Sequence, residues 1–530
     1  MAICDPVPYT LAMLISKRIR SGFIFFPFLI GLTSACGDPP RTLRVAIPGW
    51  EETINPLKTD NLNSRQIASC IFESLLQIDD EGDVVPALAR SWGWDSTRTI
   101  LTLTLRADVQ FHDGTPFNAH TAAKSLNMAA EYPENADRPP YSSISYILDR
   151  ETSVQAMDDT TLVINLKIPH ESILRTLATS VLTPMLGKDL FEVSGKYFYP
   201  GTGPFQLTHF DLDKGRIILN RFEQYWDTPP HAQRIRFTAI DNSADALNLL
   251  REGKADLSLA ISVSEISEVN SSESMDLVTG ALVNYFVIGM NNQRPPFNNP
   301  AARMALALCV DRERLVEEYY RGAAEPVTGF VLEGLLPEVE SPHAPDYNPE
   351  AARELIISSI PPQDRTIEMI FPPIYAPGKK HWLFENLEQI LSPLGLHLEP
   401  KYTTEFDEYI SLVNRREWDI SLDGMDTDNR DLFEFLYMVY GHSSQAGGYG
   451  LFGLETGELS DALEIARSST DPNEKVDYYK RVLEIITREV PCIPLWRRAQ
   501  FLIISSDVER FELGMNFSRI FSVARKKEWR

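Results

Sequence analysis

The chain has 530 residues, of which 43% are hydrophobic, and its formal net charge is −24. This length predicts more than one hydrophobic core, because single cores rarely grow past roughly 250–300 residues. The acidic balance argues against a protein that binds nucleic acid or an anionic membrane surface.

The N-terminal segment predicts export. Residues 17–20 ("KRIR") precede a short apolar run over 22–32, and the small residues of "TSAC" follow. This order is typical of a secretory signal, and the apolar run is too short to span a bilayer comfortably. The position of Cys36 resembles the lipobox of bacterial lipoproteins, in which that cysteine is lipidated and becomes the new N-terminus. We therefore predict a signal peptide over 1–35 and a lipidated tether over 36–41, with an ordinary cleaved signal as the alternative.

Strands and helices are expected to alternate along the rest of the chain. Alternating apolar residues predict strands, and apolar residues at helical spacing predict helices. The expected strands are 42–48, 99–106, 160–168, 215–222, 255–261, 396–404, 418–424 and 492–504. The expected helices are 64–76, 117–130, 242–252, 301–322, 348–359, 380–395 and 471–490. Such interleaving indicates an α/β or mixed fold.

The sequence offers no positive sign of an enzyme. It contains no G-x-S-x-G, H-E-x-x-H or G-x-x-x-x-G-K-[ST] motif, and none of the nine histidines is paired at i, i+4. We therefore expect neither catalysis nor a cofactor nor a metal. The thiols Cys70, Cys309 and Cys492 all lie in apolar contexts, which favours buried free thiols over a disulfide.

Several stretches, taken in order, resemble successive blocks of the family 5 extracellular solute-binding proteins. Dipeptide- and oligopeptide-binding proteins of ABC importers are its best-known members. The stretches are "FESLLQIDDEGDVVPALARSW", "LTLTLRADVQFHDGTPFNAHTAAKSL", "GTGPFQL", "FEQYWDTPPHAQRIRFTAI", "LREGKADL", "PPFNNPAARMALALCVDRERLVEEYYRGAAEP" and "STDPNEKVDYYKRVLEIITREVPCIPLW".

The resemblance implies two lobes that are joined by two hinge crossings and close over a ligand. Lobe I is expected from 42–76, 200–284 and 497–530, with an extra subdomain over 77–199. Lobe II is expected over 285–496, and the crossings are expected near 284–292 and 490–496.

The same resemblance implies a substrate-binding lipoprotein in the periplasm or at the cell surface. It would capture a small solute, most simply a peptide, and deliver it as a monomer to the permease of an ABC importer. Nickel chelates, oligosaccharides and opine-like compounds remain alternative ligands. A receptor or chaperone that is not coupled to transport remains an alternative function.

The acidic stretch 423–431, "DGMDTDNRD", is the main candidate binding loop. It does not fit a calcium loop, because Arg430 would occupy the fifth position and Tyr437 the twelfth. In dipeptide-binding proteins a glycine at this strand end is followed, four residues later, by an aspartate that pairs with the ligand's ammonium group. Gly424 and Asp428 have that spacing, so the resemblance assigns Asp428 to the ligand amine. A solvated acidic loop is the alternative.

Other residues complete the expected ligand site. Met425 and Asn429 flank the proposed clamp, and Asp431 is expected to be solvated or to cap a helix that starts near Leu432. By resemblance, an early loop that lines the pocket contributes Asn61, Leu62 and Asn63.

The "GTGPF" block is expected to form a turn with Gly201 and Gly203 at positive φ. Thr202, between them, is a candidate to face the cleft. In "VQFHDGTP", Gly114 is expected in a turn and His112 as a structural histidine rather than a metal ligand.

Overall fold

The structure of the protein is a computed structural model. It describes residues 40–59, 61–79, 82–131, 147–148, 152–170, 172–179, 182–262, 265–320, 323–331, 341–371, 382–404, 406–425, 431–441, 450–510, 521 and 524–529. The predicted signal peptide and Cys36 lie outside these residues, as do Asp428 and Asn429.

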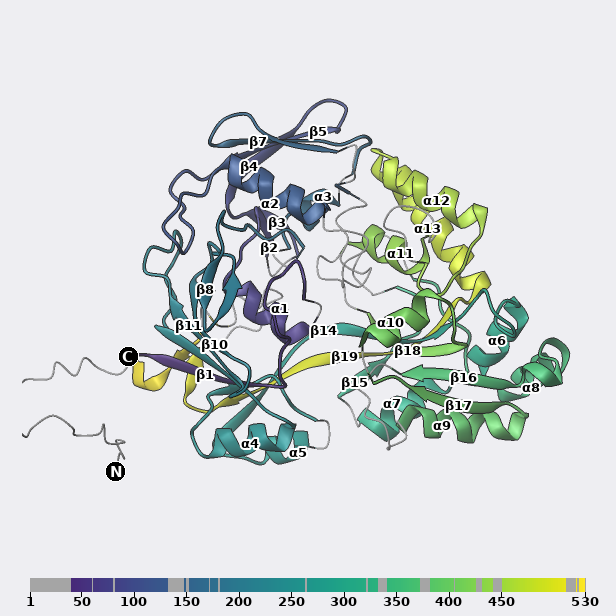
Figure 1. Ribbon diagram of the computed structural model, residues 1–530. Helices are drawn as coiled ribbons and strands as arrows, with labels where there is room; N and C mark the ends of the chain where they lie inside the picture. The colour runs from purple at the N-terminus through teal and green to yellow at the C-terminus, as the bar shows by residue number, and fades with distance from the viewer. Residues whose placement is uncertain are drawn as a thin grey trace, which may run out of the picture. The chain divides into compact units, whose positions relative to one another are not determined.

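One mixed sheet runs through the described chain and joins strands from distant parts of the sequence (Figure 1). Its order is β10-β11-β12-β1-β13-β19-β14-β18-β16-β17, and β15 pairs with β19. The strands are β1 (Thr42–Ile47), β10 (Phe205–Asp211), β11 (Arg216–Arg221), β12 (Arg234–Ala239), β13 (Leu257–Ser258), β14 (Met275–Met290), β15 (Ala324–Pro326), β16 (Thr366–Phe371), β17 (His397–Tyr402), β18 (Ile420–Met425) and β19 (Cys492–Ser505).

The two longest strands, β14 and β19, are antiparallel partners in the middle of this sheet (Figure 1). Their register runs from Met275 opposite Ser505 to Gly289 opposite Cys492. At one end β19 also pairs with β13, and at the other β14 also pairs with β18. Both predicted hinge crossings therefore fall where β14 and β19 run side by side.

A second, four-stranded sheet has the order β4-β5-β7-β6 and carries helix α2 against β6 and β7. In β5 the side chains of Leu101, Leu103 and Leu105 are buried and the residues between them are not, which confirms the strand predicted over 99–106. The strands and short hairpins of this part are β2 (Leu76–Ile78), β3 (Val84–Pro86), β4 (Ala89–Trp94), β5 (Ile100–Leu105), β6 (Ser153–Ala156), β7 (Thr161–Asn165), β8 (Phe191–Val193) and β9 (Lys196–Phe198). Strands β20 (Val508–Arg510) and β21 (Arg525–Lys526) pair near the C-terminus.

The helices start at side-chain caps in most places where their caps are described. Asn242, Asn299, Asn348, Thr456 and Asp471 each accept a backbone N–H of the first turn. The helices are α1 (Leu62–Ser69), α2 (Ala119–Glu131), α3 (Ile173–Thr176), α4 (Ser243–Arg251), α5 (Ile266–Asn270), α6 (Pro300–Leu308), α7 (Arg312–Tyr320), α8 (Pro349–Ser359), α9 (Trp382–Leu391), α10 (Phe406–Asn414), α11 (Leu432–Tyr440), α12 (Gly457–Ser468) and α13 (Pro472–Glu489).

The prediction of a single helix over 301–322 is wrong. The chain forms two helices, α6 and α7, with a break at residues 309–311. Asp311 accepts the backbone N–H of Arg314 at 3.0 Å and so begins a new helix. A capping side chain therefore overrides the continuous apolar spacing from which one long helix was expected.

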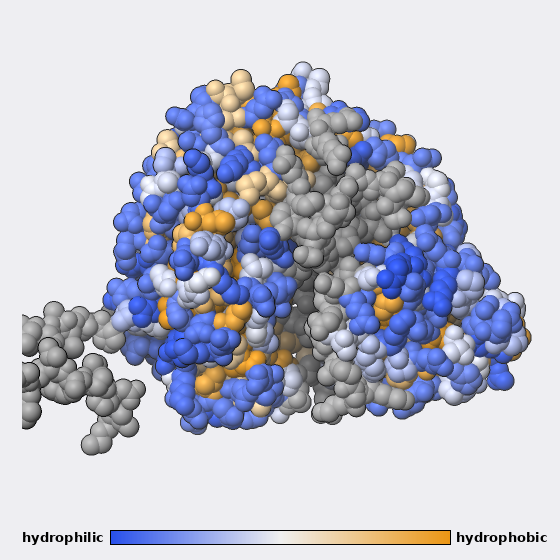
Figure 2. Space-filling view, viewed as in Figure 1, coloured by the Kyte–Doolittle hydropathy of each residue, from blue (hydrophilic) through white to orange (hydrophobic). Residues whose placement is uncertain are grey.

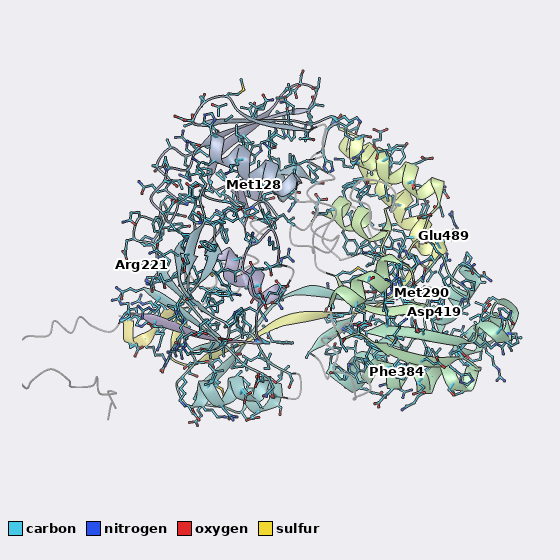
Figure 3. The ribbon with its side chains drawn as sticks, viewed as in Figure 1. Met128, Arg221, Met290, Phe384, Asp419 and Glu489 are labelled. Atoms are coloured by element: carbon cyan, nitrogen blue, oxygen red, sulfur yellow. The ribbon has the colours of Figure 1, made fainter. Side chains whose placement is uncertain are left out.

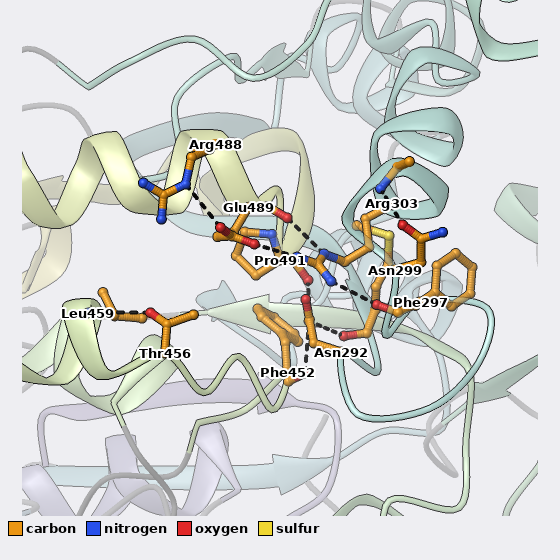
Figure 4. Close-up of polar contacts among 12 residues, drawn as sticks. Asn292, Phe297, Asn299, Arg303, Phe452, Thr456, Leu459, Arg488, Glu489 and Pro491 are labelled. Carbon is orange, nitrogen blue, oxygen red and sulfur yellow. Dashed lines mark hydrogen bonds and ion pairs between the residues drawn. The ribbon is translucent and has the colours of Figure 1, made fainter. Parts of the chain in front are cut away.

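A polar network holds the chain at the entry to β19 (Figure 4). The Arg303 guanidinium donates to the carboxylate of Glu489 at 3.0 Å and to the carbonyls of Glu489 and Phe297. The Asn292 amide donates to the carbonyls of Met290, Phe452 and Pro491. These bonds tie the end of β14 to the residues that immediately precede β19.

The glycines of the "GTGPF" block serve close approach rather than positive φ, so that part of the prediction is wrong. Neither is among the described residues with positive φ, whereas Gly114 and Gly253 are. A Cβ on Gly201 would lie 1.9 Å from the Ile71 carbonyl oxygen, and one on Gly203 would lie 2.7 Å from that of Cys70. Only glycine lets this strand entry pack directly against the backbone that follows α1.

We expect Gly201→Ala to destabilise the protein by about 2–4 kcal/mol, because the added methyl group meets backbone that cannot turn away. Chemical unfolding followed by circular dichroism measures the change. Gly93→Ala is the matched control, because a Cβ there meets nothing within 4 Å. Equal stability of the two variants would contradict the close-approach explanation.

The thiols of Cys70, Cys309 and Cys492 are free and buried, as predicted. The visible face of the molecule is mostly hydrophilic, with small hydrophobic patches between (Figure 2). Within the described ranges, no helix combines the length and apolar character needed to cross a bilayer.

Candidate functional site

The candidate site begins at one edge of the large sheet. Strand β16 pairs in parallel with both β17 and β18, so their carboxyl ends lie at the same edge. Ligands of α/β sheets commonly bind outside this edge. Gly424 and Met425 are the last two residues of β18 and therefore lie there.

Gly424 and Met425 differ in exposure. Gly424 is exposed, whereas Met425 is 5% exposed and belongs to the core. A Cβ on Gly424 would lie 3.1 Å from the Phe286 ring, which belongs to β14. Even a methyl group at position 424 would therefore contact the Phe286 ring tightly.

Aromatic side chains mark the neighbouring strand ends. Phe371, the last residue of β16, stacks on Tyr402, the last residue of β17, with ring centroids 5.1 Å apart. The Thr403 hydroxyl donates to the Phe371 carbonyl at 2.9 Å. Two stacked aromatic rings therefore border this edge of the sheet.

The early predicted residues lie at a second edge of the same kind. Strand β1 is parallel to β12 and β13, and α1 follows its carboxyl end. Asn61 is the N-cap of α1 and accepts the N–H groups of Asn63 and Ser64. Helix α1 therefore begins two residues before the predicted start at Ser64 and ends at Ser69 rather than at Leu76. The Asn63 amide donates to the Gly49 carbonyl at 3.0 Å, which fixes the helix to the loop after β1.

Leu62, in the first turn of α1, projects an apolar side chain that is 42% exposed. Thr202, in contrast, is fully buried. It faces the carboxylate of Glu73, which accepts the Tyr225 hydroxyl at 2.8 Å and the Trp226 indole N–H at 2.9 Å. Burial raises the pKa of Glu73 to about 7, and these donors oppose the rise.

Asp428 and Asn429 fall outside the described residues, so their proposed roles stay predictions. Asp431, at the end of the same acidic stretch, is described. Its carboxylate accepts the N–H of Glu434 at 2.8 Å and caps α11, which begins at Leu432. The capping prediction for this residue is confirmed.

Two buried titratable residues were not singled out by sequence reasoning. Asp423 lies on β18, and its carboxyl group accepts the hydroxyls of Tyr409 and Ser421. The sequence signals were the position of Asp423 at the start of the acidic stretch 423–431 and the polar strand face that it shares with Ser421.

The other is His170, which follows β7 in the predicted extra subdomain. Its ring meets Phe433 of α11 edge to face, with centroids 5.4 Å apart, and the residue is 4% exposed. Burial, together with the positive charges of Arg467 and Lys475, lowers the pKa of His170 to about 3. His170 thereby joins the predicted lobe I to helices of the predicted lobe II.

The described part of the chain contains no group of three or more His, Cys, Asp or Glu side chains that could hold a metal ion. His112 instead lies within hydrogen-bonding distance of the Gly203 carbonyl, at 2.9 Å, and against the Phe222 ring. This agrees with its predicted structural role.

The sequence is similar to those of known proteins. The middle part of the bacterial extracellular solute-binding proteins, family 5, matches residues 83–447. The glutathione-binding protein GsiB of Escherichia coli K12 is 25% identical over 496 residues, which cover 90% of this chain and 93% of that protein. The matched relatives are named as binding proteins rather than enzymes.

Solved structures show the fold. The periplasmic binding protein DppA from Helicobacter pylori, in complex with the peptide STSA, has a TM-score of 0.79 at 20% identity and covers 92% of this chain and 98% of its own. NikA from Staphylococcus aureus, in complex with Ni(L-His)2, has a TM-score of 0.75 at 18% identity, with 92% and 100% covered. The chain thus has the two-lobed α/β fold of periplasmic binding proteins.

Proposed function

Because the chain belongs to family 5 of the bacterial extracellular solute-binding proteins, which serve ABC importers, we propose that its ligand is a peptide. The protein captures the peptide between its lobes and delivers it to the permease. The observation that carries this choice is the end of β18, where Gly424 precedes Asp428 by four residues.

The proposed chemistry requires one fixed anion for the peptide's ammonium group. In a closed and dry cleft an unpaired ammonium costs several kcal/mol, and a carboxylate supplies charge-assisted hydrogen bonds. Asp428 takes this role, with Asn429 beside it and Met425 in the pocket wall. Relatives named for a bound peptide and for glutathione support this ligand class.

The peptide main chain is expected to pair with backbone in the cleft, so side-chain preference can be broad. The N-terminal turn of α1 supplies the opposite wall, with the exposed side chain of Leu62 as an apolar contact. Closure of the two lobes by hinge motion then encloses the ligand. Thr202 is proposed to act indirectly, because it is fully buried.

We further propose that the mature protein starts at a lipidated Cys36 and is held at a membrane from the outside. Native mass spectrometry of protein extracted from its own cells tests both proposals. A series of peptide masses retained by the folded protein supports the peptide ligand, whereas one metal-chelate mass overturns it. After denaturation, a chain mass that equals residues 36–530 plus lipid supports the anchor, and an unmodified N-terminus contradicts it.

We expect Asp428→Ala to weaken peptide binding by roughly 10- to 100-fold, because the ligand amine loses its charged partner. Isothermal calorimetry with a retained peptide measures the affinity. Asp426→Ala is the matched control, since it removes the same charge from the same acidic stretch of the sequence and is expected to change the affinity less than about 3-fold. Equal affinities for wild type and Asp428→Ala would remove Asp428 from the site.

A further inference from the structure

Asp423 occupies a defined place on β18. Its backbone lies opposite that of Val287 in β14. Because Asp423 comes two residues before Met425, the side chains of Asp423 and Met425 project from the same face of β18. Met425 ends the strand at the carboxyl edge. Asp423 therefore lies two residues before the strand end at which the candidate site begins.

The surrounding residues leave room for a carboxyl group at this position. A Cβ on Gly289, in the neighbouring strand β14, would lie 2.7 Å from the Asp423 Oδ2 atom and 2.5 Å from the Phe452 ring. The absence of a side chain at Gly289 thus makes space for the carboxylate. The hydroxyl of Ser421 donates to Oδ2 at 2.5 Å, and that of Tyr409 donates to Oδ1 at 3.1 Å.

Asp423 differs from most other buried carboxylates in the described part of the chain, because it has no cationic partner there. Its residue is partly exposed, yet among the described residues no lysine, arginine or histidine pairs with it. Burial raises the pKa of Asp423 to about 6, which the two hydroxyl donors oppose. Buried carboxylates that do pair with cations are Asp256 with Arg44 and Lys526, Asp419 with Arg294 (Asp419 is labelled in Figure 3), and Glu489 with Arg303.

Among the described residues Glu73 also has no direct cationic partner, but its carboxylate joins two segments of the chain. Each of its oxygens accepts a rigid aromatic donor, from Tyr225 or Trp226, and these bonds join two distant chain segments. At Asp423 the two hydroxyl donors use only part of the acceptor capacity of the carboxylate, so it can accept a further donor. A desolvated carboxylate gains most from a positive charge brought by a ligand.

We propose that Asp423 forms an anionic subsite that accepts a positively charged side chain of the ligand, so that the preferred cargo is a basic peptide. This inference rests on the proposed function of the protein as a peptide-binding protein. Tyr409 and Ser421 hold the carboxylate in place, two residues before Met425 at the end of β18.

Calorimetry with matched tripeptides tests the subsite. Each peptide carries lysine at one position of tri-alanine, and its partner carries norleucine, which has a similar chain without the ammonium group. At one position at least, wild-type protein is expected to bind the lysine peptide roughly 10-fold or more tightly than the norleucine peptide. Asp423→Asn is expected to bring that ratio close to one and to leave binding of the norleucine peptide unchanged.

Glu399→Gln is the matched control, because it removes one carboxylate charge from an exposed position on β17, outside the proposed subsite. This variant is expected to retain the preference for lysine. If wild type binds the peptides without such a preference, or if Asp423→Asn keeps it, the basic subsite is wrong and the peptide function stands. If wild type binds no tripeptide of either series, the peptide function fails and the subsite fails with it.

Discussion

At pH 5 we expect the protein to bind its ligand roughly 30-fold more weakly than at pH 7.5, because lobe closure must bury His170 in its neutral form. In this structure the ring lies against Phe433 of the predicted lobe II, and burial is the main reason that its pKa is lowered to about 3. When the lobes separate, the ring regains water and its pKa returns to about 6.5.

The direction of the pKa shift of His170 determines whether acid weakens or strengthens ligand binding. The closed state has the lower pKa and therefore favours the neutral ring, so protonation favours the open state. The affinity is fully present above pH 6.5 and falls as the pH drops from there toward 3. Arg467 of α12 and Lys475 of α13 add to the penalty, because both repel a protonated ring. Arg467 is partly compensated by its ion pair with Glu464.

Calorimetry between pH 5 and 7.5, with a ligand that does not titrate in this range, measures the effect. His170→Gln is expected to flatten most of the profile. His209→Gln is the matched control, because His209 is 39% exposed in its side chain and remote in sequence from the lobe contact. A profile that keeps its steep fall in His170→Gln would show that another group controls closure.

Asp256→Ala is expected to lower the free energy of unfolding by about 3–5 kcal/mol, the usual cost of removing one partner from a buried ion pair. Asp256 is 1% exposed and lies just before β13. Its carboxylate accepts the backbone N–H of Arg44 at 2.8 Å and the guanidinium Nε–H of Arg44 at 2.9 Å. The ammonium group of Lys526 lies 3.1 Å away. Alanine leaves both cations without this partner.

Denaturant unfolding followed by far-ultraviolet circular dichroism measures that loss. Glu252→Ala is the matched control, since Glu252 pairs with Lys254 in the same region but both side chains are more than half exposed. The control is expected to change stability by less than about 0.5 kcal/mol. If both variants lost a similar free energy of unfolding, the contribution of Asp256 to stability would not depend on its burial.

Local patterns predicted the strands and most helices, because burial of one face leaves a periodic signal. The strand over 99–106 and the cap at Asp431 were both accessible in this way. The break between α6 and α7 was not, because one capping aspartate outweighed an apolar pattern that continues through it. The need for glycine at positions 201 and 203 could not be predicted either, because the backbone that they contact, near Ile71, is distant in sequence.

The same limit applies to the candidate site. The position of Gly424 at a strand end follows from the local pattern and is confirmed. The significance of Asp423 depends on Gly289 and Tyr409, and that of His170 depends on Phe433. Each of these pairs is distant in sequence, so a single sequence contains no periodicity that reports the contact.

The pairing of Asp256 with Lys526 has a consequence for the order in which the chain can fold. Chains emerge N-terminus first, and β13 emerges long before its partner strand β19 or the residues near Lys526. Until then one edge of β13 remains unpaired and Arg44 is the cationic partner of Asp256 that has emerged, while the strands up to β18 have already emerged. The part of the large sheet around β13, although made early, is therefore completed only after β19 has emerged, which delays its native structure until nearly the whole polypeptide has been synthesised.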